Sequence, residues 1–229
     1  MGHVMRWLAC VLLLVPPRLL AGDAVGQIEG FVRFSGEVPP PQKILTSDGA
    51  TLLHRDLIVD AKTKGLRFVS VLVENAPFAK PRSIDPVIID QRDMQFLPRV
   101  IAVQEGRPVR IENNDLCNHA VQGFSTVEAN TFNVLTPMGQ PFEIKLRANQ
   151  HPVVLGCPIH GWMKAYVFVH PHRFFAITDA AGRFCINELG AGEYLLLFRH
   201  PDSGRKERRK IVIEAGRTTR VEVTWDTSK

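Results

Sequence analysis

The chain has 229 residues, of which 45% are hydrophobic and 22% charged, and its formal net charge is +5. This modest excess excludes a nucleic-acid-binding role, which needs a basic face presented by a recognisable module. The one dense basic stretch, residues 205–210, is typical of a solvated strand edge or turn. The length allows two small domains or one elaborated domain.

Residues 1–24 have the pattern of a secretory signal peptide. Arg6 supplies a basic start, residues 7–15 are apolar, and small residues follow at positions 21–24. The prolines and arginine at 16–18 interrupt the apolar run, which is therefore too short to span a bilayer. We expect an exported protein, periplasmic or secreted, with no stable membrane span after cleavage.

The first part of the mature chain predicts strands separated by irregular segments. Residues 27–34 alternate in a β manner, and residues 66–74 form a second clear strand. Residues 42–60 predict an irregular connection with one short strand at 57–59. The proline-rich residues 76–86 indicate a linker or crossover.

Short strands then recur about every 8 to 12 residues, with turn signals between them. The predicted strands are residues 87–90, 96–103, 109–112, 132–135, 142–146, 152–156, 165–169, 174–177, 194–198, 211–213 and 221–223. Residues 179–184 predict a turn. Since no stretch has sustained helical periodicity, the chain is expected to be nearly all β and to form a β-sandwich.

Three cysteines lie beyond the signal region: Cys117, Cys157 and Cys185. An odd number in an exported protein leaves at least one thiol unpaired, which suggests a reactive thiol or a ligand role. A disulfide between Cys117 and Cys185 stays open, because proximity cannot be deduced from sequence.

The residues Cys157, His160 and Met163 are spaced three apart on a loop between two predicted strands. His119 lies 38 positions before Cys157 and follows the polar turn at 113–115. A thiolate, two imidazoles and a weak thioether suit a trigonal copper site with a long axial bond. Zinc also binds cysteine and histidine, but a methionine ligand favours copper. Each residue alone would more often be a packing or surface residue.

These motifs resemble the cupredoxins, the blue-copper electron carriers that include plastocyanin and amicyanin. The resemblance covers about residues 87–169 and includes Phe96-Leu97-Pro98, Gly106 with Val109-Arg110-Ile111, Asn114-Asp115 with His119, residues 132–135 and the short amicyanin-like ligand spacing. It implies a Greek-key sandwich and one type 1 copper ion. It also implies His119, Cys157 and His160 as equatorial ligands and Met163 as the axial ligand. The implied function is one-electron transfer with a redox partner protein.

Two positions depart from the pattern of that family. Ala120 stands where the family usually has asparagine or serine, whose side chain helps to tie the two ligand loops together. The bulky Trp162 lies between the ligands His160 and Met163. Trp162 could shield the metal, form a docking surface, or simply pack against the sandwich.

The segments on either side resemble the transthyretin-like, carboxypeptidase-regulatory-like β-sandwich, through residues 30–32, 69–73, 177–184 and 189–194. The resemblance implies that residues 25–80 and 171–229 are two parts of one domain. The cupredoxin domain, residues 81–170, would then be inserted between them, which is tolerated where chain ends lie close together. The alternative is two sandwiches in series.

An enzymatic role is not expected. Gly156 and Pro158 flank Cys157, whereas enzymes that couple blue copper to a second centre place histidines there. We expect His170 and His172 to be surface or interdomain residues. The alternative function is a non-enzymatic binding or adhesion module whose copper site is structural or serves storage or delivery.

Overall fold

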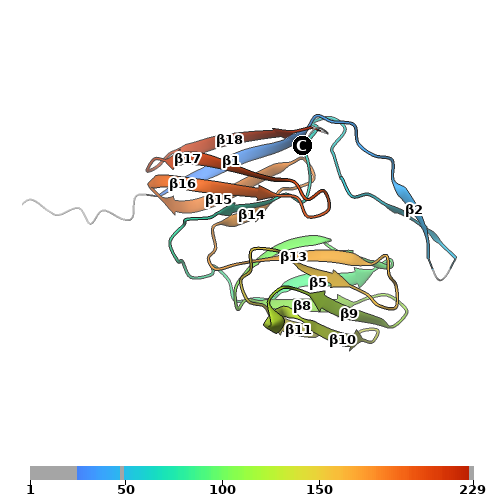
Figure 1. Cartoon of the computed structure of the whole chain (residues 1–229). Helices are drawn as coiled ribbons and strands as arrows, with labels where there is room; N and C mark the ends of the chain where they lie inside the picture. Colours follow the sequence, from blue (N-terminus) through green and yellow to red (C-terminus); the bar gives the residue numbers. More distant parts are fainter. Residues whose placement is uncertain (1–24, 47–48, 227–229) are drawn as a thin grey trace, which may run out of the picture.

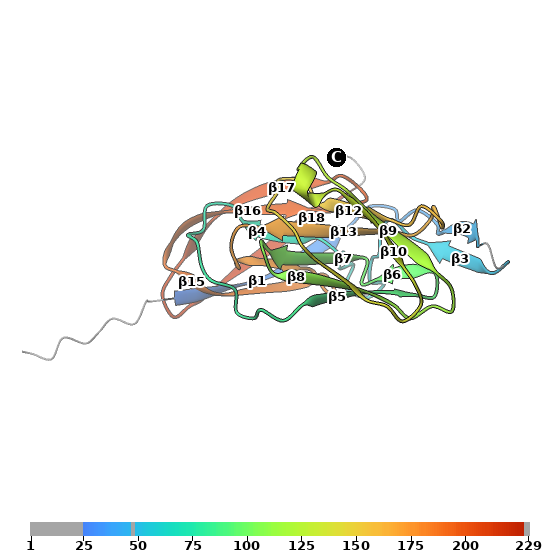
Figure 2. The ribbon, with the colours of Figure 1, turned by 90° about the horizontal axis from the view of Figure 1, so that it is seen from below.

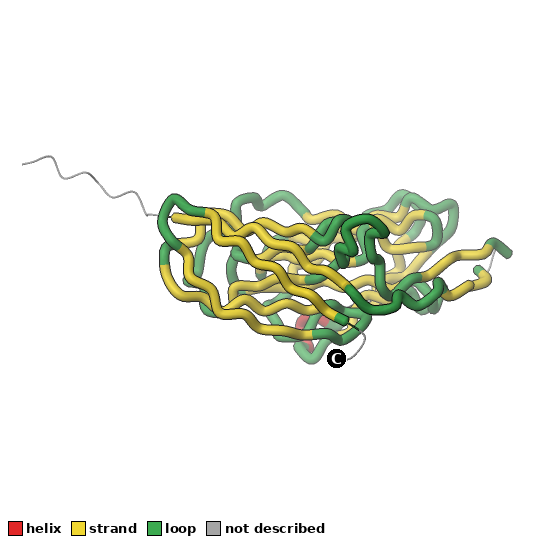
Figure 3. The backbone as a smooth tube through the Cα atoms, turned by 90° about the horizontal axis from the view of Figure 1, so that it is seen from above, coloured by secondary structure: helices red, strands yellow, loops and turns green. Residues whose placement is uncertain are grey.

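The structure is a computed structural model that describes residues 25–46 and 49–226. The predicted signal peptide at residues 1–24 lies outside this range. Within it the chain forms eighteen strands and one 3-10 turn, η1 (Glu128–Asn130), and no α-helix (Figures 1 and 3). The expected all-β class is confirmed. None of the described segments is a helix long and apolar enough to cross a membrane.

Two sheets from the chain ends pack face to face and enclose one core (Figure 1). One has the order β15-β1-β18, and the other has the order β14-β4-β16-β17. Their bounds are β1 (Val25–Phe34), β4 (Ser70–Val73), β14 (Phe175–Ile177), β15 (Arg183–Gly190), β16 (Gly192–Arg199), β17 (Lys206–Ile213) and β18 (Thr218–Trp225). Alternate residues of β1, such as Ile28 and Val32, are fully buried, as expected of a strand with one face on a core.

The middle of the chain forms a second pair of sheets around its own core. Their orders are β10-β9-β12-β13-β7 and β11-β8-β5-β6. The bounds are β5 (Val87–Arg92), β6 (Gln95–Leu97), β7 (Val100–Gln104), β8 (Pro108–Asn113), β9 (His119–Phe124), β10 (Phe132–Thr136), β11 (Phe142–Lys145), β12 (Val153–Gly156) and β13 (Lys164–His170). β7 pairs parallel with β13, and β5 pairs parallel with β8.

Strand β13 is buried on both faces after its first residue. Ala165 and Val167 belong to the core of the middle sheets, while Tyr166 and Phe168 join a small apolar cluster with Phe68 from the flanking segment. This position between two layers explains its continuous apolar sequence. In the view from below, β13 lies in front of the flanking strands (Figure 2).

The same junction carries a polar contact. Arg99 pairs with Asp202 at 2.9 Å, and the Tyr166 hydroxyl donates to Asp202 at 2.8 Å. Burial and this carboxylate raise the pKa of Tyr166 well above its usual value. The two opposite charges are therefore buried as a pair, although Arg99 Nε has no hydrogen-bond partner among the described residues.

Several local predictions were wrong. Residues 42–60 contain the hairpin β2 (Gln42–Leu45) and β3 (Thr51–His54), and the expected strand at 57–59 is a single bridge from Val59 to Leu66. These hairpin strands are mostly exposed, so they carry no apolar alternation.

The predicted strand 66–74 is shortened to β4, because Phe68 adopts a φ of +70°, which a strand cannot contain. The predicted strand 96–103 divides at Pro98, which lacks a backbone N–H. β15 starts inside the predicted turn 179–184. The basic residues 205–210 do form an edge, since β17 ends its sheet.

Candidate metal centre

Three adjacent strands position the predicted ligands. His119 is the first residue of β9, Cys157 follows the end of β12, and β12 hydrogen-bonds to both β9 and β13. The loop between β12 and β13 is closed by three backbone bonds. Cys157 N–H donates to the Met163 carbonyl, His160 N–H to the Cys157 carbonyl, and Met163 N–H to the His160 carbonyl. The loop is therefore held at both ends by one sheet.

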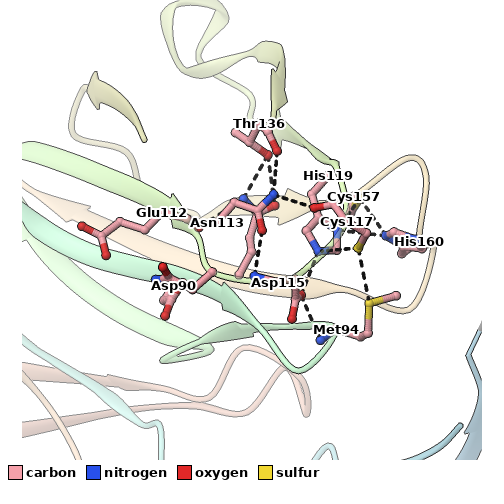
Figure 4. Close-up of polar contacts among 12 residues, drawn as sticks. Asp90, Met94, Glu112, Asn113, Asp115, Cys117, His119, Thr136, Cys157 and His160 are labelled. Carbon is pink, nitrogen blue, oxygen red and sulfur yellow. Dashed lines mark hydrogen bonds and ion pairs between the residues drawn. The ribbon is translucent and has the colours of Figure 1, made fainter. Parts of the chain in front are cut away.

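Three donor atoms converge in a buried position (Figure 4). Cys157 Sγ lies 3.9 Å from His119 Nδ1 and 3.7 Å from His160 Nδ1, and the two Nδ1 atoms are 2.9 Å apart. A trigonal ion with bonds of about 2.05 Å to nitrogen and 2.3 Å to sulfur needs S–N separations of about 3.8 Å and an N–N separation of about 3.5 Å. The sulfur distances fit as they stand, and the imidazoles need to separate by only about 0.6 Å.

Asp115 orients the first of these imidazoles. Its Oδ2 lies 2.8 Å from His119 Nε2, and a carboxylate can only accept, so Nε2 carries the hydrogen. Nδ1 of neutral His119 therefore presents its lone pair toward Cys157. An imidazole held through its second nitrogen by a carboxylate is a common arrangement around metal ions.

The buried Asn113 holds the loop that carries Asp115. Its side-chain amide donates to the carbonyls of Cys117 and Thr136, and its Oδ1 accepts from the Asp115 N–H. This amide ties the upstream ligand loop to β10. The loop is thus fixed without a polar side chain at Ala120.

The electrostatics of the centre favour a thiolate. Burial opposes ionisation of Cys157, but the His119 side chain and the backbone N–H groups of Ala120 and His160 outweigh it and hold its pKa below the usual value. For His119 burial disfavours the cation, yet Cys157 and Asp115 outweigh it and raise the pKa. A thiolate binds soft metal ions, and a proton held by His119 would leave when a metal binds.

Met163 and Trp162 lie next to these donors. Met163 is 2% exposed and belongs to the same apolar core as Cys157, and its role as the axial ligand stays a prediction. The Trp162 ring lies 5.3 Å from the His160 ring, and its indole N–H donates to the Met94 carbonyl at 3.1 Å. Trp162 therefore both packs against the sandwich and covers one side of His160.

A second thiol, which the predicted ligand set does not include, adjoins the centre (Figure 4). Cys117 Sγ lies 3.6 Å from His119 Nε2 and 3.9 Å from Met94 Sδ. Cys117, His119 and His160 place their donor atoms within 4.8 Å of one another. The sequence already points to Cys117 as a competitor for copper, because it stands two residues before His119, whereas nothing in the sequence points to Met94.

Other predicted features are placed differently. Cys117 and Cys185 form no disulfide, and Cys185 is exposed in β15.

His170 and His172 are 1% and 3% exposed, so the expected surface position is wrong. The His170 ring contacts Phe168 and Phe175, which belong to the two different layers, as the interdomain alternative expected. Burial, followed by Arg199 and His172, lowers the pKa of His170 to about 3.

The strands and the donor set define an all-β protein with a buried nitrogen–sulfur centre of the kind that binds copper. No protein-family model and no curated protein matches the chain. Among solved structures, a copper-containing nitrite reductase from Thermus scotoductus SA-01 is similar at 22% identity and a TM-score of 0.35, over 42% of this chain and 24% of that chain.

Two smaller copper proteins are similar over nearly their whole length. An oxidised amicyanin mutant is 17% identical with a TM-score of 0.34, over 44% of this chain and 98% of its own. A purple cupredoxin from Nitrosopumilus maritimus is 20% identical with a TM-score of 0.31, over 36% of this chain and 97% of its own. These scores are too low to assign the chain to a family or to transfer a function.

Proposed function

We propose that the protein is an exported type 1 copper protein that carries single electrons. The convergence of Cys157 Sγ with the Nδ1 atoms of His119 and His160, at separations close to those of a trigonal ion, is the observation that supports this proposal. Copper bound there would alternate between Cu(I) and Cu(II). Met163 is proposed as the axial ligand.

The residues around the centre suit electron transfer. The proposed ligands lie at the start of β9 and on the loop between β12 and β13, strands of one sheet, and backbone bonds and Asp115 fix them, so little has to move when the charge of the centre changes. Apolar side chains from three surrounding loops are exposed: Leu116 by 95%, Met138 by 55% and Ile159 by 53%. A redox partner with an apolar face could dock there and approach His160.

The domain organisation is part of the proposal. We assign residues 81–170 to a cupredoxin-like domain inserted between residues 25–80 and 171–229, which would form one transthyretin-like sandwich. The division is supported by the two main apolar cores, one drawn from the chain ends and the other from the middle segment.

The test is to add Cu(II) to the purified protein and record its absorption and voltammetry. We expect an intense thiolate-to-copper band, reversible one-electron redox and loss of the band in Cys157→Ser. Cys185→Ser, which changes an exposed thiol in the flanking sheet, is the matched control and should keep the band. Absence of the band, or its survival in Cys157→Ser, would refute the assignment.

Copper storage or delivery is the second candidate. Cys117 and Met94 place two further soft donors beside His119, more than a simple electron carrier needs. Binding of more than one Cu(I) per chain, together with a charge-transfer band but no reversible redox, would favour this function over electron transfer.

A further inference from the structure

A cleft of about 510 Å³ lies between the flanking layer and the middle layer. β16 and β17 line one side, and the end of β13 with residues 148–152 lines the other. Its volume is in the range that holds a small organic molecule. The cleft is remote from the metal centre: Lys164, at the start of β13, pairs with Gly156 beside Cys157, whereas His170 lies six residues further along, roughly 20 Å away.

The face of the β16–β17 pair that lines this cleft is strongly basic. Arg199 is directly opposite Lys206, and Leu197 is directly opposite Arg208, so all four side chains lie on the same face. The opposite face of β16 carries Leu196 and Phe198 of the flanking core. Like charges directly across a strand pair repel each other, which favours an anion between them.

Among the described residues that line the cleft, Glu74 alone carries a carboxylate to balance these positive charges. Glu74 lines the same cleft and forms a two-point ion pair with Arg208, at 2.6 and 2.9 Å. The side chain of Arg199 forms no ion pair or hydrogen bond within residues 25–46 and 49–226, and its Nε is buried without an acceptor. Its guanidinium lies 5.0 Å from the Phe168 ring centre, so the cation rests on an aromatic face inside the cleft wall.

A buried imidazole lies on the opposite wall. His170 is 1% exposed, lines the cleft, and its Nε2 has no hydrogen-bond partner in the described part of the chain. Apolar side chains line both walls: Leu72 lies opposite Leu197 in the flanking sheet, while Pro152 and Pro171 stand on the His170 side beside the polar residues 149–151. A ligand that satisfies both kinds of surface has an anionic oxygen group and an apolar body.

We propose that this cleft binds a small organic oxyanion, a phosphate or carboxylate carried on an apolar body. The oxyanion lies between Arg199 and Lys206, where charge-assisted hydrogen bonds replace the repulsion between the two cations. The apolar body packs against Leu72 and Pro152. The site is separate from the metal centre and does not depend on the function proposed for it.

The test is calorimetric titration of the full chain at low ionic strength with phenyl phosphate, benzoate and phenol. We expect saturable binding of at least one of the two anions, at least about tenfold tighter than phenol and weakened by added salt. The tighter of phenyl phosphate and benzoate identifies the oxyanion as phosphate or carboxylate.

The variants Arg199→Gln and Lys206→Gln should each weaken binding of that anion, Arg199→Gln by about tenfold. Arg217→Gln removes the same charge from an exposed turn outside the cleft and should leave binding within about twofold. If a melting curve shows that Arg199→Gln does not fold, the anion affinity of Lys206→Gln, a change at an exposed residue, is the deciding measurement. No saturable anion binding by the wild type up to about 10 mM, or equal weakening by Arg217→Gln, overturns the proposal.

Discussion

Removing the Asp115 carboxylate tests whether the imidazole of His119 is held for a metal ion. In Asp115→Ala the Nε2–H of His119, which is fully buried, loses its 2.8 Å acceptor. Leaving a buried donor unpaired costs about 1–3 kcal/mol, and the ring is no longer held with Nδ1 toward Cys157. We expect copper affinity to fall about 10- to 100-fold, which corresponds to about 1.4–2.7 kcal/mol.

The affinity is measured by competition with a chelator of known strength. Asp115→Asn keeps an oxygen acceptor but loses the charge, so its affinity should lie between those of the wild type and Asp115→Ala. Asp90→Ala is the matched control, because Asp90 is similarly buried and bonds to Arg92 and Asn114 rather than to His119. The reasoning is refuted if Asp115→Ala binds copper within about twofold of the wild type, or if Asp90→Ala loses as much.

Three further outcomes are expected. Cys117→Ser should keep the thiolate-to-copper band, because Cys117 faces the opposite ring nitrogen of His119 from Cys157; loss of the band would make Cys117 the ligand thiolate. Burial lowers the pKa of His170 to about 3 and of His200 to about 4. Below pH 6.5 the unfolded chain therefore binds more protons at these two histidines than the folded chain does. Each histidine lowers the free energy of unfolding by about 1.4 kcal/mol per pH unit, down to its pKa in the folded protein. His119, with a raised pKa, acts in the opposite direction. Urea unfolding of the metal-free protein should show a net loss from pH 7 to pH 5, and a flat profile would contradict the burial of both histidines. Gly65→Ala should destabilise the fold by about 2 kcal/mol, because the new Cβ would collide with the backbone carbonyl of Ala181. An unchanged urea midpoint would contradict this and show that the turn at Ala181 shifts without cost.

The middle strands were predictable because their alternation reflects a one-sided core. The convergence of Cys157 and His160 was predictable because the two residues are close in sequence and chemically distinctive. The hairpin at 42–54 was not, since most of its side chains are exposed and carry no pattern. The contact of Met94 with Cys117 joins residues 23 apart through a turn whose geometry no local pattern encodes.

The burial of His170 at the junction between the layers also could not be predicted from the local sequence. A His-Pro-His sequence suggests a solvated loop, but β13 continues through His170 into the space between the layers. Burial there depends on the flanking sheet, whose strands are close in space and distant in sequence.

The pairing of β1 with strands from the end of the chain sets an order of assembly. β1 hydrogen-bonds to β15 and lies parallel to β18, with Gln27 opposite Thr218. The middle sheets close with partners drawn only from residues 87–170. Their shorter loops cost less entropy to close, so the middle sandwich should form first. β1 can pair only after the strands near the end of the chain are in place. The metal centre would then be complete before the layer that flanks it.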